Sequence, residues 1–170
     1  MPKSVRQPLL YLAIILVFSA PGTVLAIQQA VRQTPPPPLT YTNNPFPVGQ
    51  PKDDVPPDPS VRQQLHAGDI PTLFPERCVT DDAGTGLGEL PYTFTMALYD
   101  AITRKRLADL PGGFASAPVG CQTIPSRLRT IPDDTLPGVY YLAGTATATG
   151  SSRSATVGWQ TVPFEVIPDD

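Results

Sequence analysis

The segment that decides the fold is residues 138–159, GVYYLAGTATATGSSRSATVGW. Its first half alternates between two sets of side chains, and successive side chains of a strand point to opposite faces. One set is Tyr140, Leu142, Gly144, Ala146 and Ala148, and the other is Val139, Tyr141, Ala143 and the threonines at 145, 147 and 149. Gly150-Ser151 fits the turn that reverses the chain. The segment therefore predicts a β-hairpin with one buried apolar face and one threonine-rich face in water.

The single tryptophan, Trp159, lies on the returning strand and shares its parity with Val157. Large aromatic side chains contribute much of the apolar area in a small core. We therefore interpret Trp159 as a core or rim aromatic, and a direct role in binding is the alternative.

Five further runs have the composition of short strands, rich in Thr, Val, Tyr, Phe or Ile and bounded by Gly, Pro, Asp or Ser. They are residues 72–80, 91–100, 104–110, 121–131 and 162–167. No window from Thr72 onward keeps a helical period of 3.6 residues for three turns, and proline recurs too often to permit one. With the hairpin, these runs predict an all-β fold, an antiparallel β-sandwich over residues 60–168.

Residues 1–32 have the pattern of an export segment, because a short basic stretch precedes an unbroken apolar run over residues 9–18. Two outcomes remain open. Residues 9–27 carry no charge and are long enough, as a helix, to cross most of a bilayer and anchor the chain with its C-terminal part outside the cytoplasm. Alternatively, Val24-Leu25-Ala26 suits a signal peptidase, and cleavage after Ala26 would release a secreted or periplasmic protein.

Residues 33–59 contain ten prolines in 27 residues. Proline lacks a backbone donor, and few apolar side chains are present, so we expect a semi-rigid linker with polyproline II character. Within it, residues 39–42, LTYT, alternate in polarity and could form a first strand that docks on the domain.

Cys78 and Cys121 are the only cysteines in the chain. An even number of cysteines in an exported protein favours a disulfide, and both lie in strand-like runs. Metal binding is not expected, because two cysteines and the distant His66 do not make a tetrahedral ligand set. The sequence indicates no metal and no cofactor.

The charge balance argues against nucleic acid as a partner. The chain has 12 Lys and Arg residues against 15 Asp and Glu, and two of these bases, Lys3 and Arg6, precede the apolar segment. A nucleic-acid surface needs a basic patch that replaces the counterions around phosphates. The exception is the run Arg104, Lys105 and Arg106, which we interpret as a solvated turn or strand edge.

A second candidate loop is residues 81–89, DDAGTGLGE. It departs from the dinucleotide-binding fingerprint, because residue 89 is Glu and no helix follows. Asp81, Asp82 and Glu89 could hold Ca²⁺ with backbone carbonyls, although the loop lacks the spacing of a calcium motif. We interpret it as a flexible hairpin loop. This loop and the basic run at 104–106 are the candidate binding loops.

The sequence assigns no catalytic residue. His66, the only histidine, lies in QQLHAGDIP, and no serine stands in a G-x-S-x-G context. A catalytic Cys78 would need a free thiol, which the expected disulfide removes. We interpret His66 as an exposed loop residue, and a small secreted hydrolase using His66 and Cys78 remains an alternative.

Several features together resemble a known group of proteins. A basic N-terminus, one apolar helix and a proline-rich tether precede a domain with HAGDI at 66–70 and IPDDTLPGVYYLAGTATATG at 131–150. This resembles small bacterial or phage-encoded single-pass membrane proteins with an extracytoplasmic immunoglobulin-like domain. The resemblance implies a non-enzymatic interaction or structural module with an unspecified protein partner, or a virion or cell-surface assembly subunit. The order of Cys121, the Tyr strand and Trp159 departs from antibody-type domains.

Overall fold

The computed structural model describes residues 37–80, 88–127, 129–149 and 154–169. They belong to a compact unit that spans Pro37–Asp170. The expected export segment, residues 1–32, lies outside the described residues, as does the Gly150-Ser151 turn. Among the described residues there is no helix of the length and apolar character needed to cross a membrane.

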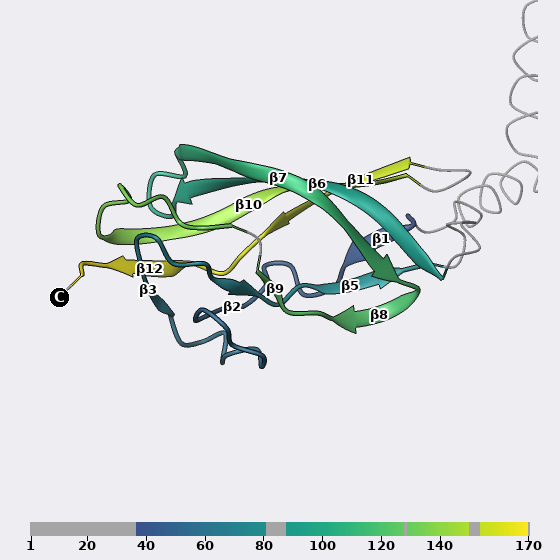
Figure 1. The fold of residues 1–170 in the computed structure, drawn as a ribbon, viewed down its shortest axis with the longest axis horizontal. Coiled ribbons are helices and arrows are strands. Elements are labelled where there is room, and N and C mark those ends of the chain that lie inside the picture. Colours follow the sequence, from purple (N-terminus) through teal and green to yellow (C-terminus); the bar gives the residue numbers. More distant parts are fainter. Residues whose placement is uncertain (1–36, 81–87, 128, 150–153, 170) are drawn as a thin grey trace, which may run out of the picture. The chain divides into compact units, whose positions relative to one another are not determined.

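The described residues form strands and no α-helix, which confirms the all-β prediction (Figure 1). In chain order the strands are β1 (Leu39–Tyr41), β2 (Val48–Gly49), β3 (Gln64–His66), β4 (Thr72–Leu73), β5 (Glu76–Val79), β6 (Glu89–Asp100), β7 (Arg106–Pro118), β8 (Gly120–Thr123), β9 (Ser126–Arg127), β10 (Gly138–Thr149), β11 (Ser154–Gln160) and β12 (Phe164–Ile167). They assemble into a sandwich-like arrangement of sheets.

The large sheet has the strand order β3-β12-β10-β6-β7. Strand β10 pairs with β12 through its first residues and with β11 through its second half. Strands β3 and β12 run parallel, whereas the other paired strands are antiparallel. The expectation of a purely antiparallel sandwich is therefore wrong at this pair. Parallel pairing needs a long connection, and most of the chain lies between β3 and β12.

The second layer consists of two small sheets, β1-β5-β8 and β2-β4-β9. Three chain segments, residues 39–49, 72–79 and 120–127, each supply one strand to both sheets. Prolines stand at the interruption in each segment: Pro45 and Pro47, Pro75, and Pro125. Proline cannot donate to a ladder, so each strand is broken at the same level of the layer.

Side chains replace the missing ladder hydrogen bonds at this interruption. The Asn43 side-chain amide donates from Nδ2 to the Phe74 carbonyl at 2.8 Å, and its Oδ1 accepts from the Glu76 amide at 2.7 Å. Asn44 does the same on β11, where its Oδ1 accepts from the Gln160 amide at 2.9 Å. Buried backbone groups need such partners, because an unpaired one costs as much as a lost hydrogen bond.

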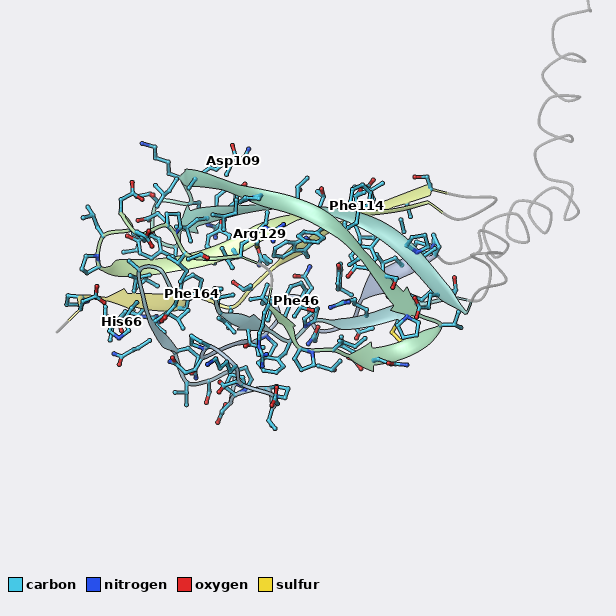
Figure 2. All side chains as sticks on the ribbon, in the orientation of Figure 1. Phe46, His66, Asp109, Phe114, Arg129 and Phe164 are labelled. Carbon is cyan, nitrogen blue, oxygen red and sulfur yellow. A yellow bond between two sulfur atoms is a disulfide. The ribbon has the colours of Figure 1, made fainter. Side chains whose placement is uncertain are left out.

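The core lies between the two layers and contains the predicted hairpin face. Tyr140, Leu142, Ala146 and Ala148 are each at most 6% exposed, while Thr145 is exposed. Trp159 is 5% exposed and stacks on Phe46 with ring centroids 5.5 Å apart, so the interpretation of Trp159 as a core aromatic is confirmed. Figure 2 shows Phe46 between the two layers.

The folded unit begins before residue 60, the expected boundary. Residues 39–41 form β1, within the segment that the sequence analysis named as a possible first strand. Val48 in β2 is fully buried. The Phe46 amide donates to the Gln160 carbonyl at 3.0 Å, and its carbonyl accepts from Val162 at 2.9 Å. Isolated apolar residues among the prolines therefore anchor half of the expected linker in the core.

The disulfide Cys78–Cys121 is present. The two cysteines are direct partners in the antiparallel register of β5 and β8. The bond ties together two short strands of the second layer at the exposed edge, where every residue of β8 is exposed.

Candidate binding surface on the large sheet

The first candidate loop is only partly described. Asp81 and Asp82 lie outside the described residues. Glu89 is the exposed first residue of β6, and its carboxylate accepts a hydrogen bond from the Ser116 hydroxyl at 2.8 Å. The structure thus places Glu89 in a strand pair rather than in a loop.

The basic run 104–106 lies at the turn between β6 and β7. Asp100 orders this turn, because its Oδ1 accepts hydrogen bonds from the Thr103 amide at 2.6 Å, the Thr103 hydroxyl at 2.9 Å and the Ile102 amide at 2.9 Å. These hydrogen bonds hold the pKa of Asp100 below its usual value, and those from Thr103 lower it most. Arg104 has a φ of 58° and donates its amide to the Asp100 carbonyl at 2.9 Å. Arg106, already in β7, pairs with Asp109.

Glu89 and the basic turn lie at opposite ends of β6. This strand has 12 residues, and at about 3.3 Å per residue its ends are about 36 Å apart. Glu89 begins the strand and the basic turn follows it, so Glu89 and the basic run do not form one site.

Close to the basic turn, two tyrosines form a ridge on the outer face of the large sheet. Tyr99 of β6 and Tyr141 of β10 are direct cross-strand partners, and their rings stack with centroids 5.2 Å apart and an interplanar angle of 14°. Both side chains are partly exposed. Stacked cross-strand aromatics are held by apolar contact and keep their hydroxyls at the surface.

A shallow hollow adjoins each tyrosine of this ridge. One, of about 280 Å³, is lined by Tyr141 and Arg104 together with Gln160 and Pro45. The other, of about 320 Å³, is lined by Tyr99 and Arg106 together with Thr95 and Thr145. The structure therefore brings two of the predicted basic residues next to aromatic rings, which the sequence did not indicate.

Further along the same face, a row of threonines leads across the sheet from one exposed aromatic ring. Phe114, in the middle of β7, is 88% exposed. Its partners across the sheet are successively Thr93, Thr147 and Thr156. The hydroxyls of Thr147 and Thr156 are 3.0 Å apart. Figure 2 shows Phe114 on the outer strand, away from Asp109 at the beginning of β7.

A separate hollow of about 560 Å³ is lined by three cationic side chains. The Arg127 guanidinium pairs with Asp54 at 3.0 Å. Arg129 donates to the carbonyls of Pro111 and Gly112 at 3.0 Å each, and Lys52 lies on the same rim. Both arginines are thus engaged with the protein itself, and Arg129 covers two carbonyls of the edge strand β7.

His66 ends β3 and lies far from Phe114 in Figure 2. Its Nδ1 lies 3.0 Å from the Asp169 carboxylate, and its amide donates to Asp69 Oδ2 at 2.7 Å. Within the described ranges, no group of three or more His, Cys, Asp or Glu side chains is placed to hold a metal ion.

Sequence reasoning identified the wet threonine face but missed Phe114 and the tyrosine ridge. Tyr141 already carried a signal, since it shares the parity of the threonines in the hairpin. Phe114 follows two glycines in PGGFAS. This context did not indicate which face of a strand its ring would occupy. No protein-family model matches the chain, and a comparison with curated proteins finds no significant match.

Proposed function

We propose that the folded unit is an extracytoplasmic, immunoglobulin-like module that acts through protein contacts and not as an enzyme. In this proposal the N-terminal segment exports the chain and either anchors it in the membrane or is removed. The outer face of the large sheet is the contact surface. The observation that carries the proposal is the exposure of Phe114 on the edge strand β7, at the end of an uncharged row of threonines that crosses the sheet.

An aromatic ring on a strand is usually turned toward a core or a partner. Phe114 is 88% exposed, and its cross-strand row consists of threonines without any charge. Interface centres are depleted of charged residues and enriched in aromatic side chains, and a few such residues supply most of the binding energy. The cross-strand row that begins at Phe114 has this composition.

The tyrosine ridge extends the same surface. Tyrosine and arginine are the residue types most enriched among residues that dominate binding energy, and Tyr99, Tyr141 and Arg106 lie together on this face. The disulfide Cys78–Cys121 supports a location outside the cytoplasm, because disulfides persist in oxidising compartments.

Site-specific photo-crosslinking tests the contact surface. A photoreactive phenylalanine analogue at position 114 of the exported full-length chain is expected to give a discrete protein adduct in a bacterial host. The matched control is the same analogue at Val55, which is 75% exposed in a segment between β2 and β3. Equal labelling from both positions, or none from position 114, would contradict the proposal. Phe114→Ser should reduce the binding of the captured partner and leave the thermal midpoint unchanged.

Intact mass tests the compartment. A full-length mass from the membrane fraction indicates an anchor, and a mass beginning at Ile27 in the soluble exported fraction indicates a removed signal. Either product should lack free thiols. Recovery of the chain from the cytoplasm with both cysteines reduced would contradict an extracytoplasmic module.

A second candidate, an assembly subunit of a virion or cell surface, is favoured by one specific observation. Residues 110–124, which include most of β7 and all of β8, carry no charge. Both are edge strands of their sheets, and natural edge strands are commonly protected by charges. Concentration-dependent self-association of the exported chain in sedimentation equilibrium would favour this candidate, and a monomer at high concentration would exclude assembly through this edge.

A further inference from the structure

Arg77 in β5 is the only charged side chain among the described residues that is buried. It is 6% exposed. Its Nη2 donates to the Ile124 carbonyl at 3.4 Å and to the Ser126 hydroxyl, at the interruption of the second layer. Its Cζ lies 5.8 Å from the centroid of the Tyr92 ring. These contacts hold the guanidinium between the two layers.

The charge of Arg77 has no carboxylate partner among the described residues. The ion pairs of the described chain are His66–Asp169, Arg106–Asp109 and Arg127–Asp54. In addition, Nε of Arg77 is buried without a hydrogen-bond partner. A buried cation costs several kcal/mol unless an anion compensates it and its donors are satisfied.

The nearby tyrosines do not supply the missing negative charge. Burial raises the pKa of Tyr41, an effect to which Tyr92 adds and which Arg77 partly opposes. Burial likewise raises the pKa of Tyr92 against the opposite effect of Arg77. Both phenols are therefore protonated at neutral pH, and each is a hydrogen-bond donor rather than an anion.

A cavity of about 20 Å³ adjoins this cation. Its lining includes Arg77 and Ser126 together with the rings of Tyr41, Phe46, Tyr92 and Trp159. A volume of this order accommodates one water-sized particle. Tyr41 is only half-buried, so the cavity lies close to the surface.

We propose that this cavity binds a small monovalent anion of the size of chloride against the Arg77 guanidinium. The anion neutralises the buried charge, and the protonated hydroxyls of Tyr41 and Tyr92 are the donors available around it. A water molecule of the same size would satisfy a donor but leave the charge uncompensated. Larger anions, such as sulfate or an organic acid, exceed the cavity.

Thermal unfolding of the full-length chain tests this site. The midpoint is measured in sodium chloride, sodium bromide and sodium gluconate at the same ionic strength. An anion present at ten times its dissociation constant should raise the midpoint by about 4 °C over gluconate, and above the dissociation constant the rise should continue with the logarithm of the halide concentration. Arg77→Met, which keeps an apolar side chain of similar length, should abolish the difference between the salts. Arg127→Met in strand β9 is the matched control and should retain it.

Equal midpoints in the three salts, or a halide effect that survives in Arg77→Met, would overturn the proposal. A second measurement serves if Arg77→Met fails to fold. Crystals of the wild-type chain grown in sodium bromide should show an anomalous peak at the bromine edge within contact distance of the Arg77 guanidinium. Density in the cavity without an anomalous signal would identify a water molecule only and would equally overturn the anion site.

Discussion

The large sheet is built from long strands, whereas the layer that faces it is built from pieces of two to four residues. Strands β6 and β10 have 12 residues each and β7 has 13. Strands β1, β2, β4, β5, β8 and β9 have between two and four. The large sheet is thus held mainly by backbone ladders. The second layer depends on the side chains of Asn43 and Arg77, one disulfide and contact with the core.

This difference follows from where proline and threonine stand in the chain. Alternating threonine and alanine continue a strand through β10 without loss of a donor. Prolines interrupt all three segments of the second layer at one level, and an amide side chain then takes over hydrogen bonds that the backbone cannot make. Substitutions that remove a side-chain link should therefore affect the second layer more than the large sheet.

The largest expected effect is the loss of the disulfide in the second layer. The paired substitution Cys78→Ser with Cys121→Ser opens a link between residues 43 positions apart. The chain-entropy relation gives a loss of about 4 kcal/mol in the free energy of unfolding. Chemical denaturation measures it, and reduction of the wild-type chain should give the same loss. An unchanged free energy would show that β5 and β8 are held by other contacts.

The next effect tests the large sheet, where backbones approach closely. A Cβ at Gly144 would lie 1.9 Å from the Thr95 carbonyl oxygen. Since backbone must move to admit it, Gly144→Ala should lower the free energy of unfolding by about 3 kcal/mol. Gly158→Ala on the paired strand β11 is the control, because no other atom would lie within 4 Å of a Cβ at this position. A similar loss in both variants would contradict the close approach of β6 and β10.

A smaller effect is expected at the interruption. Asn43→Ala leaves the Phe74 carbonyl and the Glu76 amide without their partner, which should cost about 2 kcal/mol. Asn43→Asp keeps the acceptor and loses the donor, so its cost should be intermediate. The control is Gln63→Ala, whose side chain makes an exposed local bond to Val61. If Asn43→Ala and Gln63→Ala cost the same, the side-chain link does not stabilise the layer.

The smallest effect concerns pH and the turn of the large sheet. Hydrogen bonds from Thr103 hold the pKa of Asp100 below its usual value. The carboxylate therefore contributes stability at pH values above the unfolded pKa, and this contribution is lost as the pH falls below about 4. The thermal midpoint of the wild type should fall toward that of Asp100→Ala at low pH. Asp109→Ala is the control, and parallel curves for wild type and Asp100→Ala would contradict the prediction.

The sequence predicted those parts of the fold that a local pattern encodes. The alternation of residues 139–149 identified the buried face that contains Tyr140 and Leu142, and the two cysteines identified the disulfide. The parallel pairing of β3 with β12 was not predictable, because the two strands lie about a hundred residues apart and no local pattern records which distant strands meet. The start of the folded unit was placed too late, because proline content outweighed the anchors Phe46 and Val48.

For the candidate surface, the sequence predicted which side chains are exposed but not which of them lie close together. The bases at 104–106 were expected at a turn, and Arg104 lies in one. Their position beside Tyr99 and Tyr141 depends on the register of β6 with β10 and β7, which side-chain packing sets. The burial of Arg77 was equally unpredictable. Arg77 shares the buried parity of Val79 in β5, but an arginine is rarely fully buried, so its charge favoured an exposed position.

The two ends of the folded unit lie at opposite ends of the sandwich. Pro37 precedes β1 at one end, and the chain leaves β12 at the other (Figure 1). Tension applied between these ends would run along the strands, so the ladders of β1 and β12 would be loaded in shear, with their hydrogen bonds sharing the force instead of opening one after another. Under such tension, the covalent link between β5 and β8 would limit how far the second layer could extend.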